Sequence, residues 1–335
     1  MQSGFSVIGV GSPIVDFLAR VPEDFLAGVP GEKGGMVMID GAELRSIMAK
    51  LGNSGAVRRS PGGSAGNTVF DLAHLGVPTA LLGTVGQDEE GAFYRDALRR
   101  AGGSVHGLRE VAGAPTGACL CLVTPDAERT MRPSLAAALA FDPAGVTEND
   151  FAGYALAHIE GYLLAHSEEK VEHLLRTAHD AGCRVSLDLA SFEVVRSFRS
   201  AIRHLVGKYV DVVFANSDEA DALCGAKPVA DQLAEMQELA ETAVLKQGER
   251  GAWASRGGKV FFAPARDVRA VDTTAAGDSF AAGFLYGMLR DWEMRSILEF
   301  GAAVAAETVQ VVGAALPDSS WEKLNREAAR LAAGK

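Results

Sequence analysis

The chain has 335 residues, of which 48% are hydrophobic and 22% are charged, a composition typical of a globular protein that buries a large core. Its 32 basic and 43 acidic residues give a formal net charge of −11. This acidic balance argues against binding of nucleic acid over an extended surface, which needs clustered Lys and Arg. The sequence contains no apolar run long enough to span a membrane and no signal-peptide pattern at its start. We therefore expect a soluble, cytoplasmic protein with neither nucleic-acid nor membrane partners.

Short apolar runs alternate with helical patterns along most of the chain. The helical pattern at 65–75 stops at Gly76, and the pattern at 89–101 stops at Gly102. A later stretch, 277–312, is almost entirely helical in pattern and rich in alanine. Apolar strands that alternate with helices predict an α/β fold with a doubly wound, mostly parallel sheet covered on both faces. The expected strands span residues 5–11, 79–85, 117–124, 129–132, 156–160, 184–189, 210–215 and 242–246.

Two segments interrupt this alternation. Residues 14–39 and 111–132 are better described as extended stretches with turns than as strand–helix units. We expect them to form, discontinuously, a small β-sheet lid beside the main domain. Neither a long Pro- and Ser-rich linker nor an internal repeat divides the chain, so residues 1–335 are predicted to form a single α/β domain with this lid.

Several common site motifs are absent. Gly9 and Gly11 follow an expected strand, but Ile14 occupies the position of the third glycine in a dinucleotide-binding fingerprint. The phosphate-binding P-loop motif does not occur either. Cys119 and Cys121 lie two apart on an expected strand and face the same side, and none of the four cysteines forms a Cys-x-x-Cys pair. We expect the cysteines to be small buried apolar side chains rather than ligands of a metal.

The most informative stretch is the Asp-Thr-Thr-Ala-Ala-Gly-Asp run from Asp272 to Asp278, which precedes a long helical pattern. Small residues let an anion approach the backbone, and the free N–H groups and dipole of a helix start favour negative charge there. Beside such an anion, Asp278 is placed to accept a hydroxyl proton. The alternative on spacing alone is that Asp272 or Thr273 caps the helix and Asp278 stabilises its dipole.

Two further stretches are weaker signals by themselves. A glycine cluster from Gly62 to Asn67 leads into a helix, and its backbone N–H groups and the Asn67 side chain suit the hydroxyls of a sugar. Asn216 and Glu219 lie three apart at the start of another helix, where they suit metal-bound water near phosphates. The structural alternatives are an ordinary glycine-rich turn and a helix capping box, respectively.

In this order, the stretches resemble the signatures of the PfkB family of carbohydrate and nucleoside kinases, which have the ribokinase-like fold. The cluster at Gly62–Asn67 resembles the first family signature and Asp272–Asp278 the second. Asn216 and Glu219 match the Asn-x-x-Glu motif, and Lys246–Gly251 resembles a turn near the nucleotide. The resemblance spans nearly the whole chain and implies an ATP-dependent sugar or nucleoside kinase that uses Mg²⁺.

The resemblance also implies a role for each matched residue. Asp278 is the implied catalytic base, and Ala275, Ala276 and Gly277 form the anion hole. Glu219, with Asn216, arranges Mg²⁺ through its waters. Further implied roles are ATP binding by Thr273, Lys246, Gly248 and Gly251, acceptor binding by Asp16, Gly62, Gly63, Asn67 and Glu160, and a monovalent-cation (K⁺) site at Asp272 and Thr274.

The acceptor is less well defined by the sequence. The stretch from Glu128 to Arg132 resembles adenosine-kinase-like members, and the bulky lid residues Phe17, Met36 and Met38 suit either a base or ordinary packing. Arg132 suits instead a charged sugar acid or sugar phosphate. We place a nucleoside such as adenosine ahead of a free sugar or sugar acid (ribose, fructose, 2-keto-3-deoxygluconate), and a sugar phosphate third. A non-catalytic sensor of nucleosides or sugars is the alternative from another class, and the chain is either a monomer or a homodimer.

Overall fold

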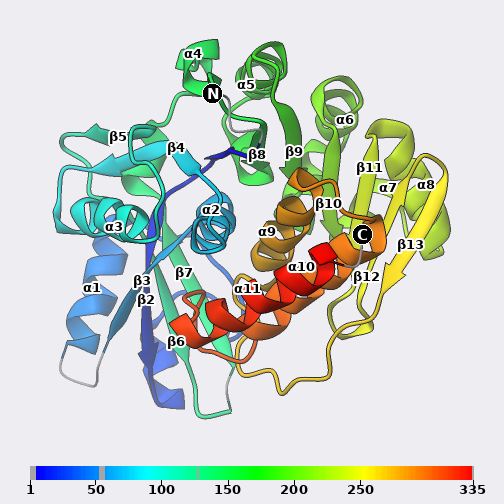
Figure 1. The fold of residues 1–335 in the computed structure, drawn as a ribbon. Coiled ribbons are helices and arrows are strands. Elements are labelled where there is room, and N and C mark those ends of the chain that lie inside the picture. The colour runs from blue at the N-terminus through cyan, green and yellow to red at the C-terminus, as the bar shows by residue number, and fades with distance from the viewer. Residues whose placement is uncertain (1–4, 53–56, 127, 334–335) are drawn as a thin grey trace.

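A nine-stranded sheet forms the centre of the protein in a computed structural model that describes residues 5–52, 57–126 and 128–333 (Figure 1). Its strand order is β13-β12-β11-β10-β9-β8-β1-β4-β5. The pairs from β11 to β5 are parallel, whereas β12 and β13 extend one edge as an antiparallel hairpin. The strands are β1 (Val7–Val10), β4 (Thr79–Gly86), β5 (Leu108–Val111), β8 (Leu156–Glu160), β9 (Arg184–Asp188), β10 (Val212–Asn216), β11 (Thr242–Lys246), β12 (Ala252–Arg256) and β13 (Lys259–Ala263).

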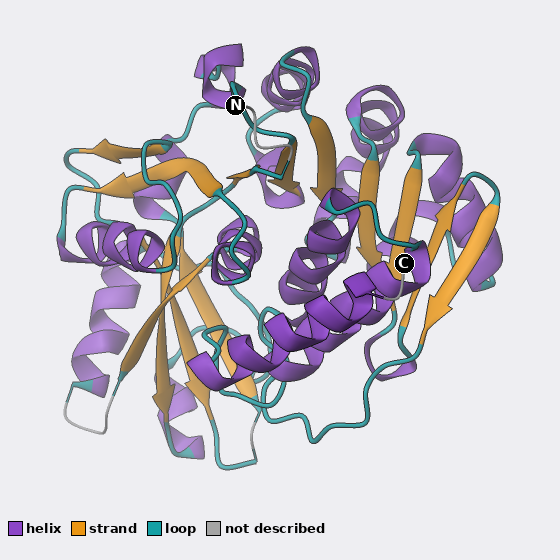
Figure 2. Ribbon diagram, in the orientation of Figure 1, coloured by secondary structure: helices purple, strands orange, loops and turns teal. Residues whose placement is uncertain are grey.

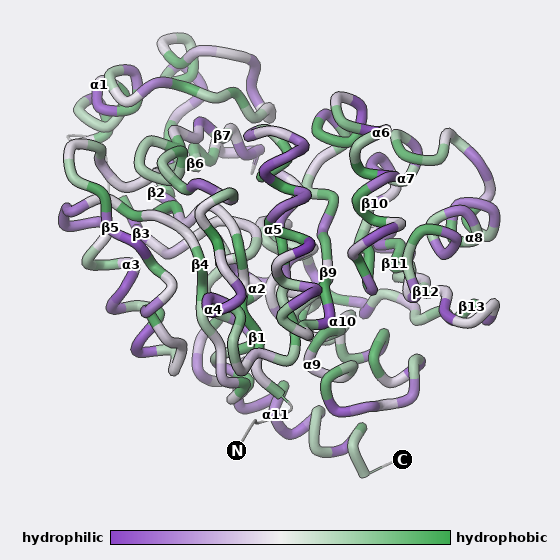
Figure 3. Tube along the Cα trace, turned by 90° about the horizontal axis from the view of Figure 1, so that it is seen from above, coloured by the Kyte–Doolittle hydropathy of each residue, from purple (hydrophilic) through white to green (hydrophobic). Residues whose placement is uncertain are grey.

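Helices cover both faces of this sheet, as the alternating pattern predicts (Figure 2). One core places residues such as Leu174, Leu205 and Met236 against the sheet, and the other uses Phe284 and Phe300. Hydrophobic residues predominate in β1 and β10, whereas α5 alternates between hydrophilic and hydrophobic residues along its length (Figure 3). The first face carries α5 (Glu168–Asp180), α6 (Phe192–Tyr209), α7 (Ser217–Cys224) and α8 (Val229–Leu239), and the second carries α2 (Ser64–His74), α9 (Ala276–Leu289), α10 (Met294–Thr308) and α11 (Asp318–Ala333).

A second, four-stranded sheet, the lid sheet, has the order β3-β2-β6-β7. Its outer face packs Leu120 and Leu122 against Ile47 and Leu51 of α1 (Gly41–Leu51). The predicted lid segments 14–39 and 111–132 supply most of this sheet, but one strand comes from outside both. The lid strands are β2 (Ile14–Arg20), β3 (Arg58–Gly62), β6 (Gly117–Val123) and β7 (Arg129–Ser134).

The remaining helices connect these layers. In the described part of the chain, no helix combines the length and apolar character that crossing a membrane requires. The predicted helical stretch 277–312 is two helices, α9 and α10, which break between Leu289 and Met294. The connecting elements are α3 (Glu89–Arg100), α4 (Glu148–Phe151) and the short 3₁₀ turns Glu23–Gly28, Ala136–Ala140, Pro143–Gly145, Gly161–Ala165 and Gly248–Arg250.

Candidate active site

Polar side chains close the carboxyl ends of four neighbouring parallel strands. Glu160 ends β8, Asp188 ends β9, Asn216 ends β10 and Lys246 ends β11. The register pairs Glu160 with Asp188 and Asn216 with Lys246. Ligands of open α/β sheets bind outside this edge, because loops there can surround a ligand while the strands hold the side chains rigidly. The candidate site therefore lies between this edge, the start of α9 and the lid sheet.

The start of α9 combines a tight turn with a carboxylate. Ala275 is the N-cap residue and has a left-handed backbone, with φ 58° and ψ 7°. The N–H group of Ala276 donates to the Thr273 carbonyl at 3.3 Å, whereas first-turn N–H groups such as that of Gly277 have no intrahelical acceptor. Asp278 is half-buried in this first turn. The predicted anion hole and the predicted base therefore occupy one helix start.

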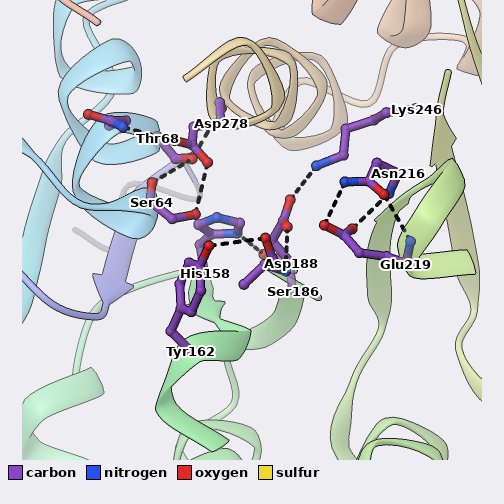
Figure 4. Close-up of polar contacts among 12 residues, drawn as sticks. Ser64, Thr68, His158, Tyr162, Ser186, Asp188, Asn216, Glu219, Lys246 and Asp278 are labelled. Atoms are coloured by element: carbon purple, nitrogen blue, oxygen red, sulfur yellow. Dashed lines mark hydrogen bonds and ion pairs between the residues drawn. The ribbon is translucent and has the colours of Figure 1, made fainter. Parts of the chain in front are cut away.

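Helix α2 holds Asp278 through a polar stripe, which we define as Ser64, Asn67, Thr68 and Asp71. The Ser64 hydroxyl donates to Oδ1 of Asp278 at 2.8 Å, and the Asn67 amide donates to Oδ2 at 2.8 Å (Figure 4 shows Ser64, Thr68 and Asp278). The Thr68 hydroxyl donates to the Asp278 carbonyl at 3.1 Å. Asn67, predicted to bind the acceptor, is thus hydrogen-bonded to Asp278, the predicted base. Sequence reasoning missed the others, although their spacing of three, one and three residues places them on one helix face.

The polar stripe continues into the interior through Asp71. Ser279 donates to Asp71 Oδ2 at 2.6 Å and accepts from Thr308 Oγ1 at 2.8 Å, so α2, α9 and α10 are joined by buried hydrogen bonds. Burial raises the pKa of Asp71 to about 7, with Ser279 opposing and Asp278 adding to the rise. This network fixes how α9 sits on α2 and so fixes the direction of Asp278.

The pKa of Asp278 is raised to about 7, chiefly by burial. The hydrogen bond from Asn67 lowers it, the charge of Asp188 raises it, and Ser64 and Lys246 lower it. A carboxylate with a pKa near neutrality takes up a proton more readily than an exposed aspartate. The pKa of Asp278 therefore lies in the range expected of a general base, which is the role predicted for it.

Lys246 pairs with Asp188 at 2.5 Å, and the two side chains are only 13% and 6% exposed. Burial opposes the charge of Lys246, but the pKa is nevertheless raised because Asp188 and Glu219 lie close. A Cβ atom added to Gly277 would lie 3.2 Å from Nζ of Lys246, so the ammonium group lies beside the start of α9. A cation at a helix N-terminus is unfavourable unless an anion is shared between them. This arrangement therefore fits a transferring phosphoryl group.

Asn216 and Glu219 form the capping box named as the structural alternative. Glu219 accepts from the backbone N–H and the side-chain amide of Asn216, both at 2.7 Å, and its own N–H donates to Asn216 Oδ1 at 2.9 Å. Glu219 is 2% exposed, and burial raises its pKa to about 7 while Asp188 adds to the rise. Capping does not remove Glu219 from the site, because Asp278 and Lys246 both affect its pKa.

The carboxylate of Asp272 is already engaged by the protein. Oδ1 accepts from Arg129 at 2.6 Å and from Thr274 N–H at 2.9 Å, and Oδ2 accepts from Gly313 N–H at 2.8 Å. The Thr274 hydroxyl also donates to Oδ1, at 2.5 Å. These bonds leave little capacity in Asp272 for the monovalent cation predicted there.

Glycines shape the turns around the site. The turn after Lys246 includes Gly251, where φ is +95° and an added Cβ would lie 2.3 Å from the Ala263 carbonyl. Gly248, with φ +57°, opens the same turn and faces no neighbouring atom within 4 Å. At Gly62 an added Cβ would lie 2.5 Å from the Asp16 carboxylate, and Gly63 has φ +91°. The predicted acceptor-binding residues Asp16, Gly62 and Gly63 are therefore adjacent.

Glu160 ties the lid connection to α2. Oε1 accepts from the Ser12 N–H at 2.8 Å, and Oε2 accepts from the Ala65 N–H at 3.1 Å. An added Cβ at Gly11 would lie 2.3 Å from Oε2, so the glycine makes room for this carboxylate. Because backbone N–H groups engage both oxygens, the contacts of Glu160 favour a structural role over the predicted contact with substrate.

The position and contacts of Arg132 contradict its predicted role in substrate binding. Its side chain is fully buried on the outer face of the lid sheet, opposite to the face that carries Asp16. The guanidinium donates to the carbonyls of Gly35 at 2.8 Å, Met131 at 2.7 Å and Glu32 at 3.0 Å, and also to that of Pro30. A guanidinium with these four acceptors holds the loop at residues 30–35 and has no access to an acceptor molecule. Phe17, whose position is also on the outer face, packs into the hydrophobic clusters there.

Comparison with known proteins decides the family. The model of the pfkB family carbohydrate kinases matches residues 35–321. The chain belongs to the PfkB family. The ATP-dependent ribose-1-phosphate kinase of Halopiger xanaduensis is 31% identical over 259 residues, which are 77% of this chain and 83% of that protein.

Two adenosine kinases match more of the chain. Adenosine kinase of Saccharomyces cerevisiae is 25% identical over 332 residues, 93% of this chain and 96% of that protein. The crystal structure of adenosine kinase from Sinorhizobium meliloti is 28% identical, has a TM-score of 0.86 and covers 97% of this chain and 100% of its own. The predicted family, the ribokinase-like fold and the assignment as a kinase are thus confirmed.

Proposed function

We propose that this PfkB kinase transfers the γ-phosphoryl group of ATP to a hydroxyl of a nucleoside, with Asp278 as the base. The observation that carries the proposal is the geometry at the start of α9, where Ser64 and Asn67 each hold one oxygen of the Asp278 carboxylate at 2.8 Å. Such a fixed carboxylate beside free N–H groups suits proton removal next to a developing negative charge.

The residues of the candidate site have separate proposed roles in phosphoryl transfer. Asp278 accepts the proton of the acceptor hydroxyl, and the N–H groups at Ala275–Gly277 with the Lys246 ammonium stabilise charge on the phosphoryl oxygens. Mg²⁺, when bound with ATP, neutralises the charge of its phosphates. Asn216 and Glu219 are proposed to orient the water molecules of that ion. Thr273, Gly248 and Gly251 remain predicted ATP contacts, and a K⁺ site would need backbone oxygens in place of Asp272.

A nucleoside is the favoured acceptor for two reasons. The two adenosine kinases align over almost their whole length and over 93% and 97% of this chain. In addition, the lid sheet places Met36 beside Met131 on its inner face, and Met36 and Met38 are 46% and 55% exposed, so apolar surface is available for a base.

A sugar phosphate is the second candidate, and Arg129 is the observation that favours it. Its Nε atom is buried without a hydrogen-bond partner in the described part of the chain, next to Asp16 on the inner face. A guanidinium group with donors to spare suits the phosphate of an acceptor. The similarity to a ribose-1-phosphate kinase points in the same direction.

A coupled assay of ADP release tests the proposal. The purified chain with ATP and Mg²⁺ should release ADP with adenosine or a related nucleoside well above the rate without acceptor. Free sugars, 2-keto-3-deoxygluconate and ribose phosphates complete the panel. Asp278→Asn should lower turnover by about 10²–10⁴-fold, the usual contribution of a general base, while ATP binding measured by calorimetry persists. If no compound of the panel raises ADP release above the rate without acceptor, the result would instead support the sensor alternative.

A further inference from the structure

Three potential metal-ligating side chains meet on the inner face of the lid sheet. The parallel register places Asp16 of β2 beside Cys119 of β6, and Cys121 follows two positions later on the same face. One ligand atom from each of the three lies within 4.8 Å of the others. Among the residues that the structure describes, no other group of three His, Cys, Asp or Glu side chains is close enough to share an ion. We call these three residues the thiol cluster.

We propose that the thiol cluster binds one soft divalent cation, with Zn²⁺ as the reference ion, and that the bound ion blocks the acceptor site. The sequence predicts the cysteines to be apolar packing, because neither belongs to a Cys-x-x-Cys pair. The carboxylate that completes the set lies 103 residues before Cys119 and reaches it only through the β2–β6 pairing.

The geometry is close to that of a tetrahedral site. A zinc ion with Zn–S bonds of about 2.3 Å holds two sulfur atoms about 3.8 Å apart. The Sγ atoms of Cys119 and Cys121 are 4.0 Å apart, so only a small movement is needed. Two thiolates and one carboxylate leave the fourth position open to water or another small ligand, as in zinc sites with three protein ligands.

The ligand types select a soft cation over the Mg²⁺ that accompanies ATP. Thiolate sulfur favours ions such as Zn²⁺, whereas Mg²⁺ requires oxygen ligands in an octahedral arrangement. Among the described residues, no group donates a hydrogen bond to the Asp16 carboxylate. Arg129 is the nearest cation, but its own partner is Asp272 at 2.6 Å. The carboxylate oxygens of Asp16 are therefore available as ligands of a cation at the thiol cluster.

A disulfide between Cys119 and Cys121 is the competing chemistry, and the strand disfavours it. Both cysteines are free and lie on one β-strand, where residues two apart are separated by about 6.6 Å along the chain. That separation is near the upper limit for a disulfide, whose sulfur atoms would also have to approach to about 2.0 Å. A bridging ion satisfies both sulfur atoms without this distortion.

Metal titration of the whole, reduced and metal-free protein tests the proposal. Cd²⁺ serves as the probe because its bonds to thiolates give an ultraviolet charge-transfer band. We expect one equivalent to bind with this band and with release of protons, because metal-bound thiols are deprotonated. Cys119→Ser combined with Cys121→Ser should abolish the band and weaken Cd²⁺ and Zn²⁺ binding by more than about 100-fold, since loss of even an outer-shell partner costs 10–100-fold.

Cys183→Ser combined with Cys224→Ser is the matched control, because these buried cysteines lie in the main domain away from the thiol cluster. This control should bind Cd²⁺ like the wild type. An unchanged band in the Cys119/Cys121 variant, with folding verified by circular dichroism, would overturn the proposal, as would absence of the band in the wild type.

The blocking effect, which rests on the proposed function, needs a second measurement. Zn²⁺ should raise the KM for the acceptor without changing that for ATP, and a chelator that prefers Zn²⁺ to Mg²⁺ should reverse the effect. Cd²⁺ binding without any turnover would refute the proposed function and leave the metal site intact. Turnover that Zn²⁺ does not inhibit, in protein that binds Cd²⁺, would refute the blocking effect.

Discussion

At the scale of single residues, burial and hydrogen bonding act in opposite directions on Asp278. Burial raises its pKa to about 7, and the amide of Asn67 pulls the pKa down. Burial is the larger of the two effects, and a donor on a different helix opposes it. Below the pKa Asp278 carries a proton and cannot accept one, so activity should rise with pH through about 7.

Asn67→Ala removes the hydrogen bond that lowers the pKa of Asp278. We expect the acidic limb of the kcat/KM profile to move to higher pH, because the buried carboxyl then holds its proton more tightly. Profiles of kcat/KM against pH for wild type and variant, with the acceptor found in the ADP-release assay, measure this shift.

Thr68→Val is the matched control, since the Thr68 hydroxyl bonds the backbone carbonyl of Asp278 rather than its carboxylate. Its acidic limb should stay in place. If Asn67→Ala raises the KM for the acceptor without shifting the acidic limb of the kcat/KM profile, Asn67 binds the acceptor, as the sequence predicts.

The sequence predicts best those local structures that a few neighbouring residues define. The run that ends in Asp278 predicts the start of a helix from its own residues. Asn216 and Glu219 likewise lie within a single helical turn. Ser64 and Asp188 were missed because their roles depend on partners 214 and 58 residues away, respectively. Arg132 was assigned wrongly because an arginine in a strand has the same appearance whichever face of the sheet it occupies.

At the scale of elements, the start of α9 is held in a conformation that its sequence disfavours. Ala275 adopts φ 58°, which costs an L-residue about 1–2 kcal/mol. The turn that presents the proposed anion hole is thus maintained by the contacts of α9 with α2 and α10. Functional turns often keep such strain because the surrounding structure over-determines them.

Ala275→Gly should relieve this strain. The relieved strain is about 1–2 kcal/mol, and the greater freedom of glycine in the unfolded chain cancels about 0.5–1 kcal/mol of it. We therefore expect the free energy of unfolding to rise by about 0.5–1 kcal/mol. Urea denaturation without ligands measures it. Ala276→Gly, at the first helical position, should instead be neutral or destabilising by up to about 1 kcal/mol. A loss of stability in Ala275→Gly would show that the methyl group contributes more than the backbone costs.

Most strands were predictable because they are buried on both faces and are therefore continuous apolar runs. The lid strand β3 was missed for the opposite reason. Its sequence, Arg-Arg-Ser-Pro-Gly, has no apolar alternation, and it lies at the edge of the lid sheet, where charged residues and proline are tolerated. Pairing with β2 defines this strand, and a sequence pattern cannot reveal that pairing.

At the scale of the whole molecule, an ion pair beside the site links the lid sheet to the main domain. Arg129 of β7 and Asp272 before α9 are 143 positions apart, and their side chains are 20% and 9% exposed. Partly buried pairs contribute more than exposed pairs, because breaking them leaves a charge without a partner. The position of the lid is therefore linked to the loop that leads into Asp278.

Arg129→Gln should loosen the lid without unfolding the main domain. We expect amide hydrogen exchange in β6 and β7 to become about tenfold faster, equivalent to about 1.4 kcal/mol, with the main sheet unchanged. Lys33→Gln is the control, because Lys33 pairs with Asp126 in the same hairpin but within the lid. Equal exchange in wild type and Arg129→Gln would show that the ion pair does not hold the lid.

The contact between Ser64 and Asp278 also has a consequence for synthesis of the protein. Helix α2 emerges early from the ribosome, but the helix that pairs with its polar stripe follows more than 200 positions later. Until then Ser64, Asn67 and Asp71 lack their α9 partners, and contacts of such long sequence separation form slowly. The polar stripe of the nascent chain therefore lacks these partners through most of translation, and during that time it is open to chaperones and proteases.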